Sequence, residues 1–299
     1  MSAKSIQRYK IHHLGILCDN LEANVNFYTK VLGHEICDHT ESSIWVGSGS
    51  EIFLELIGPP FSPEQAAWHV ERGTGIHHLA LEVDSLDVAW SQLITAGVDP
   101  IHLPIETAQR KSFMIWDDSH VPIEIVEQKE KVPKAQSTDR PVDFLLHHFD
   151  IFSDNWQRSK AFYERHFGFQ SIFEYIYDHS GAFIYIADSF FDSSSRQAMI
   201  EIIGPPYQEA REFEFAEKYR TGIDHIGYVV SDVGRAHRLA IERGSKEFMQ
   251  PYADYGTEMC WIQDANHADL ELMLAVPAQE LQQAFESRVP FRPNRLNQI

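Results

Sequence analysis

The chain has 299 residues, which is enough for two ordinary domains, and its hydrophobic content of 43% predicts a globular protein with a substantial core. The formal net charge of −19 argues against a nucleic-acid partner, because nucleic-acid affinity depends on cationic contacts to phosphates. The N-terminus has no apolar signal region, and three scattered cysteines without a CxxC pair favour a cytoplasmic protein over a disulfide-bonded one.

In chain order, the sequence repeats one set of elements four times. An apolar strand that carries histidine opens each unit, with the sequences "KIHHLGIL", "GIHHLALEV", "LLHHFDIF" and "GIDHIGYVV". A segment with apolar residues at a period near 3.6 follows each strand, which predicts a helix. These helices should end at Gly33, Gly97, Gly168 and Gly244, because glycine suits the left-handed position after a helix. Two or three short strand-like runs close each unit, for example "SIWVGS" and "IFLELIG" in the first.

The repeat also predicts the domain organisation. Two units occupy residues 11–60 and 75–127, and two more occupy residues 145–206 and 222–275. We therefore expect one domain at residues 1–130 and a second at residues 143–276. The charged, turn-rich stretch between them predicts a linker at residues 131–142, and residues 277–299 continue past the last unit as a tail.

Each unit places one histidine on its first strand and one glutamate on its last. The histidines are His13, His78, His148 and His225, and the glutamates are Glu55, Glu124, Glu201 and Glu271. The distance from histidine to glutamate is 46 residues in both the second and the fourth unit. A carboxylate within an aliphatic run such as "FLELI" is costly to bury unless it is paired or bound to a metal. Two histidines and two glutamates that converge would suit Zn, Ni, Co, Mn or Fe(II).

The segments "IHHLGI", "NVNFYTKVLG", "ELIGPP", "GIHHLALEV" and "IEIVE" resemble the vicinal oxygen chelate superfamily, which includes glyoxalases, bleomycin resistance proteins and extradiol dioxygenases. The pattern is most similar to methylmalonyl-CoA epimerase-like and glyoxalase-like members. The resemblance implies an α+β fold in which four βαβββ modules form two domains with cup-shaped mixed sheets. It also implies a divalent metal ion in each cup.

Carried onto matching positions, the resemblance implies one ligand set per half. These sets are His13, Glu55, His78 and Glu124 in the N-terminal half, and His148, Glu201, His225 and Glu271 in the C-terminal half. The family also pairs modules across halves or subunits, so the residues alone leave the grouping of ligands open.

The function that we expect is that of a metal-dependent isomerase or epimerase acting on a small, oxygen-rich carbonyl substrate. A metal-stabilised enolate or enediolate would form, with Glu124, Glu271, Glu55 and Glu201 as the catalytic carboxylates that move protons. One alternative is an Fe(II) ring-cleaving dioxygenase of the extradiol type, with its site at His148, His225 and Glu271. Lactoylglutathione lyase and a non-catalytic small-molecule binding or resistance protein are further alternatives.

Other polar residues near the proposed ligands have weaker signals. His12, His77, His147 and Asp224 each precede a proposed ligand, so strand alternation predicts that they face outward. Arg110 and Lys111 in "AQRKSF" could bind an anionic substrate near the first set, although solvated surface is the commoner place for such cations. We expect a small molecule as the partner, neither membrane nor nucleic acid, with a homodimer as an open alternative.

Overall fold

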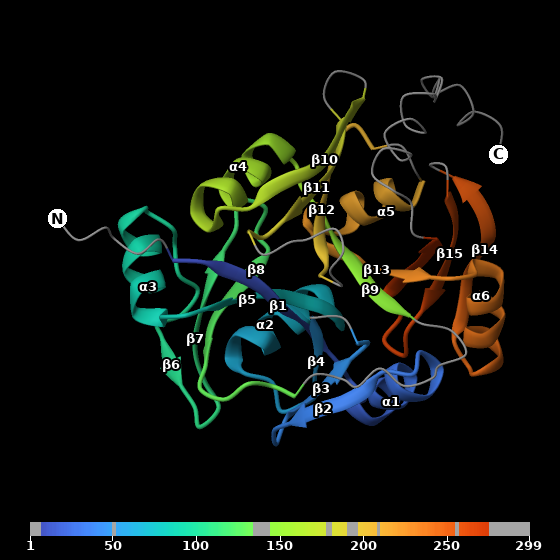
Figure 1. Cartoon of the computed structure of the whole chain (residues 1–299), viewed down its shortest axis with the longest axis horizontal. Coiled ribbons are helices and arrows are strands. Elements are labelled where there is room, and N and C mark those ends of the chain that lie inside the picture. Colours follow the sequence, from blue (N-terminus) through green and yellow to red (C-terminus); the bar gives the residue numbers. More distant parts are fainter. Residues whose placement is uncertain are drawn as a thin grey trace.

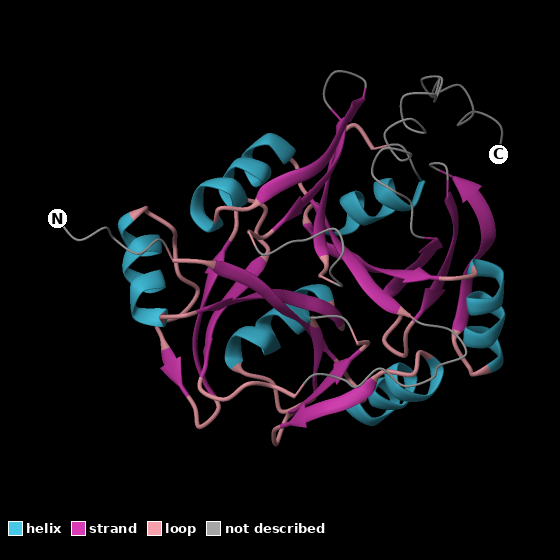
Figure 2. Cartoon of the chain, in the orientation of Figure 1, coloured by secondary structure: helices cyan, strands magenta, loops and turns pink. Residues whose placement is uncertain are grey.

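The computed structural model describes residues 7–49, 52–133, 144–177, 181–189, 197–207, 210–254 and 257–274. These residues form two eight-stranded mixed sheets, one from each half of the chain, with helices packed on their outer faces (Figures 1 and 2). The expected α+β fold is therefore confirmed. Most of the expected linker and the whole expected tail (residues 277–299) lie outside the described residues.

The first sheet has the strand order β2-β3-β4-β1-β5-β8-β7-β6. Its strands are β1 (Tyr9–Leu17), β2 (Glu35–His39), β3 (Ser43–Gly47), β4 (Phe53–Ile57), β5 (Gly75–Val83), β6 (Ile105–Glu106), β7 (Arg110–Trp116) and β8 (Pro122–Gln128). β1 is parallel to β4 and antiparallel to β5, which in turn is parallel to β8. The first and last strands of both units thus lie side by side at the centre of the sheet.

The second sheet repeats this order as β10-β11-β12-β9-β13-β16-β15-β14. Its strands are β9 (Leu145–Phe152), β10 (Gln170–Tyr177), β11 (Gly181–Ala187), β12 (Met199–Gly204), β13 (Gly222–Val230), β14 (Lys246–Asp254), β15 (Thr257–Gln263) and β16 (Asp269–Leu274). Both sheets pair units from the same half of the chain, which settles the grouping that the sequence left open.

The four expected helices are present. They are α1 (Leu21–Asn26), which continues as a π-helical turn (Phe27–Val31), and α3 (Leu86–Thr95), α4 (Trp156–Phe167) and α6 (Val233–Glu242). Each begins after a residue whose side-chain oxygen accepts a hydrogen bond from a backbone N–H of the first turn, namely Asn20, Ser85, Asn155 or Asp232. None of the described helices is long and apolar enough to cross a membrane.

Two further helices, α2 (Pro63–Arg72) and α5 (Ala210–Tyr219), join the two units of each half. Neither helix was expected from the sequence. α2 begins with a capping box, in which Ser62 and Gln65 each bond the backbone of the other, and Pro63 occupies the first turn. That local signal is present in "FSPEQ" and accounts for where the helix begins.

The two strands that begin the units of each half carry β-bulges at their His-His or Asp-His pairs. In the β1–β5 ladder, Ile11 pairs with Leu81 and His13 with Ala80, which leaves His12 as an extra residue. His77 is likewise extra between Ile76 and His78. The β9–β13 ladder has the same shifts at His147 and at the Asp224-His225 pair. A bulge interrupts the alternation of side chains, so neighbouring residues need not face opposite sides.

The two halves pack through a matched pair of buried contacts. The Tyr28 hydroxyl donates to Asp264 across the halves at 3.0 Å, and the Tyr163 hydroxyl donates to Asp117 at 2.9 Å. One hydrophobic cluster contains buried residues from both halves, among them Tyr9. In Figure 1, α1 lies against the second half and α4 against the first, so the helix that follows the first strand of each half supports the other half.

Candidate metal centres

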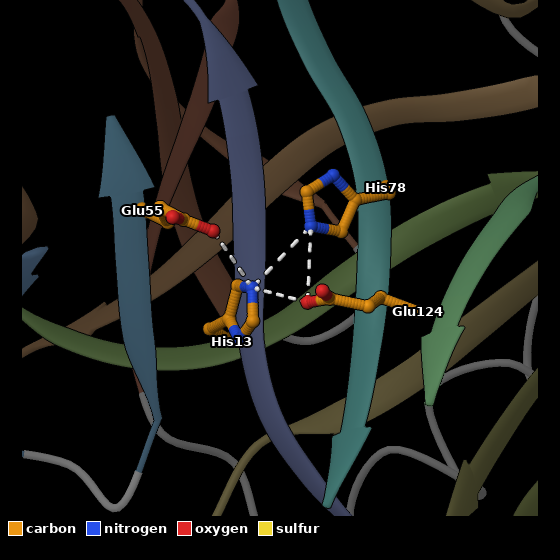
Figure 3. A group of neighbouring side chains, drawn as sticks. All are labelled: His13, Glu55, His78 and Glu124. Carbon is orange, nitrogen blue, oxygen red and sulfur yellow. Dashed lines mark hydrogen bonds and ion pairs between the residues drawn. The ribbon is translucent and has the colours of Figure 1, made fainter. Parts of the chain in front are cut away.

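The N-terminal centre is formed by one residue from each of the four central strands of the first sheet (Figure 3). They are His13 on β1, Glu55 on β4, His78 on β5 and Glu124 on β8, and all four are buried. One ligand atom from each lies within 4.8 Å of the others. The structure thus brings together the four residues that were expected in this half.

The close contacts of this centre converge on the Nε2 atom of His13. That atom lies 3.1 Å from Glu55 Oε2, 3.4 Å from Glu124 Oε2 and 3.3 Å from His78 Nε2. Two nitrogen ligands about 2.0–2.1 Å from one tetrahedral ion are also about 3.3 Å apart. Glu124 Oε2 is buried without a hydrogen-bond partner, which is costly unless a cation satisfies it. The geometry and the nitrogen and oxygen donors therefore fit a divalent metal ion.

A glycine makes room for one of the two histidines. Gly15 pairs with Glu55 on one side and with His78 on the other. A Cβ at residue 15 would lie 1.9 Å from His78 Cε1, so the imidazole rests directly on the glycine backbone. This close approach explains why "HHLGI" has no side chain at that point of the strand.

The rings of the two proposed ligands His13 and His78 are each oriented by the histidine that precedes them in the sequence. His12 Nδ1 lies 2.8 Å from His13 Nδ1, and His77 Nδ1 lies 2.9 Å from His78 Nδ1. Burial lowers the pKa of His12 and of His77 well below the usual range, and the adjacent histidines lower it further. A neutral His12 can accept the Nδ1 proton of His13, which leaves His13 Nε2 free for an ion.

The prediction that these preceding residues face outward is wrong. His12 and His77 are only 6% and 3% exposed, and they contact the proposed ligands instead of solvent. The physical reason is the β-bulge at each pair, which breaks the alternation on which the prediction rested.

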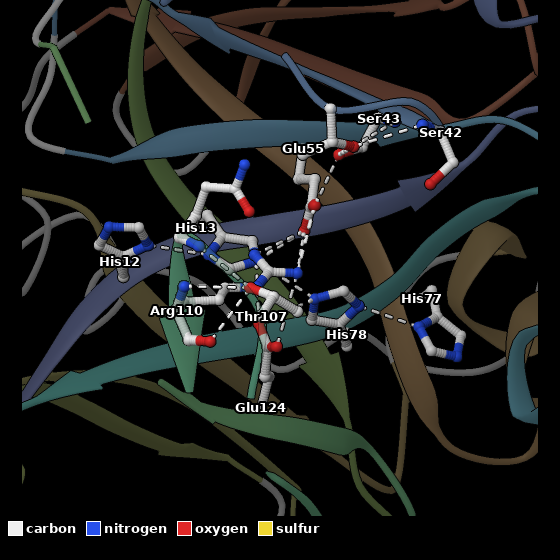
Figure 4. A network of polar contacts seen from close by, with 12 residues as sticks. His12, His13, Ser42, Ser43, Glu55, His77, His78, Thr107, Arg110 and Glu124 are labelled. Carbon is white, nitrogen blue, oxygen red and sulfur yellow. Dashed lines mark hydrogen bonds and ion pairs between the residues drawn. The ribbon is translucent and has the colours of Figure 1, made fainter. Parts of the chain in front are cut away.

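Arg110 on β7 lies against the two glutamates (Figure 4). Its Nη2 atom is 3.3 Å from Glu55 Oε1 and 3.6 Å from Glu124 Oε1, and its guanidinium lies over the Trp45 ring at 5.4 Å. Although burial opposes ionisation, Arg110 and His13 hold the pKa of Glu55 well below its usual range. Burial lowers the pKa of His78 to about 4. Glu55 and His78 therefore carry no extra proton near neutral pH and are ready to bind a cation.

The expectation that Arg110 belongs to the solvated surface is wrong, because its side chain is only 22% exposed and contacts the proposed ligands. Lys111 does lie away from the centre, with Nζ 3.9 Å from Glu127 Oε1 and a side chain that is 33% exposed. Arg110, Glu55, His78 and Glu124 all line one cavity of about 960 Å³. The N-terminal centre thus opens into a space that can hold a small molecule.

The C-terminal centre has the same plan in the second sheet. His148 Nε2 lies 3.2 Å from each of Glu201 Oε2, Glu271 Oε2 and His225 Nε2. Ligand atoms of His148, His225 and Glu271 lie within 4.8 Å of one another, and Glu201 joins this set through His148. The glycine that makes room for a histidine is again present, but on the other strand of the pair. Gly227 on β13 lies under the ring of His148 on β9, and a Cβ at residue 227 would be 2.0 Å from His148 Cε1.

The surroundings of His225 distinguish the two centres. Its Nδ1 lies 3.0 Å from Asp224 Oδ2 and 3.5 Å from Asp150 Oδ2, and Asp224 is itself bonded to Arg211 from α5. Burial alone would lower the pKa of His225, but the hydrogen bonds that it donates to Asp224 and Glu271 raise it to about 10. Asp224 had been expected to face outward, yet its side chain is only 4% exposed. This ligand is therefore protonated near neutral pH before an ion binds.

Several residues of the centres had no distinctive signal in the sequence. Asp150 replaces the glycine that follows the first histidine pair by two residues, and both of its oxygens are buried without a hydrogen-bond partner. Arg211 comes from a helix that the sequence analysis did not predict. Alignment of "HHLGI" with "HHFDI" marks the Asp150 exchange and could have indicated that the halves differ.

Comparisons with known proteins agree with this architecture. A model of the Glyoxalase/Bleomycin resistance protein/Dioxygenase superfamily matches residues 10–125 and 145–272. Uncharacterized protein YwkD of Bacillus subtilis (strain 168) is 29% identical over 126 residues, which are 40% of this chain and 96% of that protein. Uncharacterized protein YaeR of Escherichia coli (strain K12) is 27% identical over 127 residues, with the same coverage.

Solved structures share the fold at low identity. A mutant of 4-hydroxymandelate synthase from Streptomyces coelicolor has a TM-score of 0.67 and 13% identity, over 94% of this chain and 98% of its own. The Mn(II)-bound glyoxalase from Novosphingobium aromaticivorans has a TM-score of 0.62 and 16% identity, over 90% and 83%. The 2,3-dioxygenase LapB from Pseudomonas sp. KL28 has a TM-score of 0.64 and 15% identity, over 90% and 92%.

Proposed function

The chain belongs to the Glyoxalase/Bleomycin resistance protein/Dioxygenase superfamily, and from this premise we propose that it is a divalent-metal-dependent isomerase or epimerase. Its substrate is a small carbonyl compound with two neighbouring oxygens. The observation that carries the proposal is the buried set of His13, Glu55, His78 and Glu124. Of these, Glu55, His78 and Glu124 line a cavity of about 960 Å³.

His13 and His78 would hold the ion through Nε2, and Glu55 and Glu124 through Oε2, the oxygens that face the histidines. A divalent ion bound there would polarise a carbonyl and make the neighbouring C–H acidic. The remaining chemistry belongs to the side chains. Glu124 lines the cavity, and because Arg110 and the histidines outweigh its burial and lower its pKa, it is ionised and can accept a proton.

Glu55 is the matching proton carrier on the other side of the centre. Ser43 donates to its Oε1 at 2.9 Å, which leaves Oε2 directed at the ligand histidines. Glu55 and Glu124 stand on β4 and β8, which flank β1 and β5 on opposite sides. One carboxylate can take a proton from the substrate, and the other can return a proton to the opposite face of the planar intermediate. In the second half, Glu201 and Glu271 would have the corresponding roles.

A second candidate activity is ring-cleaving oxygenation at the C-terminal centre. The observation that favours it is the set of His148, His225 and Glu271, whose ligand atoms lie within 4.8 Å of one another and match the 2-His-1-carboxylate pattern of Fe(II) oxygenases. Among the structural neighbours, LapB is a 2,3-dioxygenase. Oxygen consumption with catechols by the iron-loaded protein would distinguish this activity from isomerisation.

The test of the isomerase proposal is exchange of substrate hydrogen with solvent. Protein loaded separately with Mn(II), Co(II), Ni(II) or Zn(II) is incubated in D₂O with a panel of 2-oxo and 2-hydroxy acids, their amides and glutathione thiohemiacetals. We expect deuterium next to the carbonyl carbon, and loss of exchange after chelation and in Glu124→Gln. Absence of exchange with every ion, together with activity that survives chelation, would contradict the proposal.

A further inference from the structure

Arg110 is the feature that most clearly separates the two centres. The inference drawn from it rests on the proposed function and concerns the class of substrate. In the ladder of β7 and β8, Met114 pairs with Glu124, and in that of β15 and β16, Trp261 pairs with Glu271. Four residues before each lie Arg110 and Thr257. The position of Arg110 is therefore occupied in the second half by Thr257, whose hydroxyl donates to the backbone oxygens of Glu258 and Leu274.

The contacts of Arg110 leave the ion-binding oxygen of Glu124 available. Nη2 of Arg110 lies 3.6 Å from Oε1 of Glu124, whereas Oε2 of Glu124 faces His13 and has no hydrogen-bond partner. At Glu55 the guanidinium contacts both oxygens, Oε1 at 3.3 Å and Oε2 at 3.4 Å. The guanidinium and an ion can therefore bind different oxygens of Glu124, and they share Oε2 of Glu55. Arg110 also lines the cavity beside these residues.

The charges of the two loaded centres then differ. In the N-terminal centre, two carboxylates and a divalent ion cancel, neutral imidazoles add nothing, and Arg110 leaves one surplus positive charge at the cavity wall. In the C-terminal centre, the neighbouring cation Arg211 is already bound to Asp224, and Asp150 contributes another acid group. No surplus positive charge is left among the described residues of that centre.

We propose that the N-terminal centre selects small carboxylic acids with an oxygen on the adjacent carbon, the 2-oxo and 2-hydroxy acids, and that Arg110 determines this selection. A guanidinium matches a carboxylate in shape and donates to it through parallel N–H groups. The two oxygens of such an acid would chelate the ion, and its carboxylate charge would be offset by Arg110. The C-terminal centre, by contrast, should bind neutral compounds as well as it binds the corresponding acids.

The experiment measures binding to Mn(II)-loaded protein by water-proton relaxation, with lactate as the anionic probe and lactamide as its neutral isostere. Protein with only the N-terminal centre (His148→Ala) should bind lactate about tenfold or more tightly than after Arg110→Met, because hydrogen bonds between charged groups are the strong ones. Lactamide should bind equally in both. Lys111→Met removes a charge from the neighbouring position outside the cavity and should change neither affinity.

Equal weakening of both probes in Arg110→Met, or no weakening of lactate, would overturn the proposal. If Arg110→Met no longer folds or binds Mn(II), the proposal is tested on proteins that keep Arg110. The preference for lactate over lactamide must then be larger in protein with only the N-terminal centre than in protein with only the C-terminal centre (His78→Ala), and equal preferences refute the inference. Because binding is measured without turnover, absence of deuterium exchange would contradict the isomerase proposal without contradicting the selection of carboxylic acids by Arg110.

Discussion

The two centres should differ in how metal binding depends on pH, because His78 and His225 start in different protonation states. In the C-terminal centre, Asp224 and Glu271 outweigh burial and raise the pKa of His225 to about 10, so this imidazole carries an extra proton. An ion can bind Nε2 only after that proton leaves. In the N-terminal centre, burial lowers the pKa of His78 to about 4, and no such proton is present.

The size of the effect follows from these values. Between pH 6.5 and 8.5 the C-terminal centre must release one proton per ion, so its apparent affinity should rise about tenfold per pH unit, or about 100-fold and 2.7 kcal/mol over the range. In the N-terminal centre His78 releases no proton over the same range, so the rise in affinity there should be smaller than in the C-terminal centre. Both pKa values lie more than a unit outside this window, so the contrast does not depend on their exact size.

The assay is calorimetric titration of Mn(II) into metal-free protein with one centre removed, by His78→Ala or by His148→Ala. Buffers with different ionisation enthalpies give the number of protons released. In the protein with only the C-terminal centre, Asp224→Asn should abolish most of the pH dependence, because the carboxylate that charges His225 is gone. Equal slopes for the two centres, or a slope that survives Asp224→Asn, would refute this reasoning.

The same proton affects the stability of the metal-free protein. Because the folded pKa of His225 lies above the unfolded value of 6.5, its contribution to the free energy of unfolding is fully present below pH 6.5. It is lost as the pH rises through about 10. Urea unfolding of apo protein at pH 6.5 and 9.5 should show a loss that Asp224→Asn lacks.

Two further substitutions test the packing around the centres. Gly15→Ala should push the His78 ring aside and lower the ion affinity of the N-terminal centre by at least about tenfold. Gly234→Ala is the control, because its Cβ would have ordinary contacts and should leave the affinity unchanged. Equal ion affinities of the two variants would contradict the view that Gly15 makes room for the His78 ring. Tyr163→Phe removes the buried donor to Asp117 and should lower the free energy of unfolding in urea by about 1–3 kcal/mol. A change below about 0.5 kcal/mol would show that this contact between the halves contributes little.

The sequence could predict the repeat, the four helices after the histidine strands and the convergence of the eight histidines and glutamates. It could do so because period and spacing carry that information. A helix with period 3.6 and a stop at glycine is a local property, and the equal distance from His78 to Glu124 and from His225 to Glu271 reflects equivalent strands. The pairing of units within halves became visible only from the ladders of the two sheets.

The orientation of the neighbouring histidines could not be predicted, because it depends on β-bulges. A shift of one residue in a strand moves a side chain to the other face, and no residue in "KIHHLGI" marks that shift. The contacts that fix the ring orientation of His13 and His78 therefore come from residues that strict alternation had assigned to solvent.

The environment of Arg110 was hidden for a related reason. A cation at the start of a strand is most often solvated, and only the ladder register places this one beside Glu55 and Glu124. Long-range placement also explains Arg211, since it reaches Asp224 from a helix thirteen residues earlier in the chain. Such contacts depend on how elements pack, which local patterns do not encode.

The most direct test of the metal centres is the ion content of protein purified without added metal. Elemental analysis should find two divalent ions per chain, one ion in His78→Ala and one in His148→Ala, and none when both histidines are replaced. Metal-free protein that takes up no ion on titration, or an ion content that neither substitution changes, would contradict the view that these side chains hold a cation.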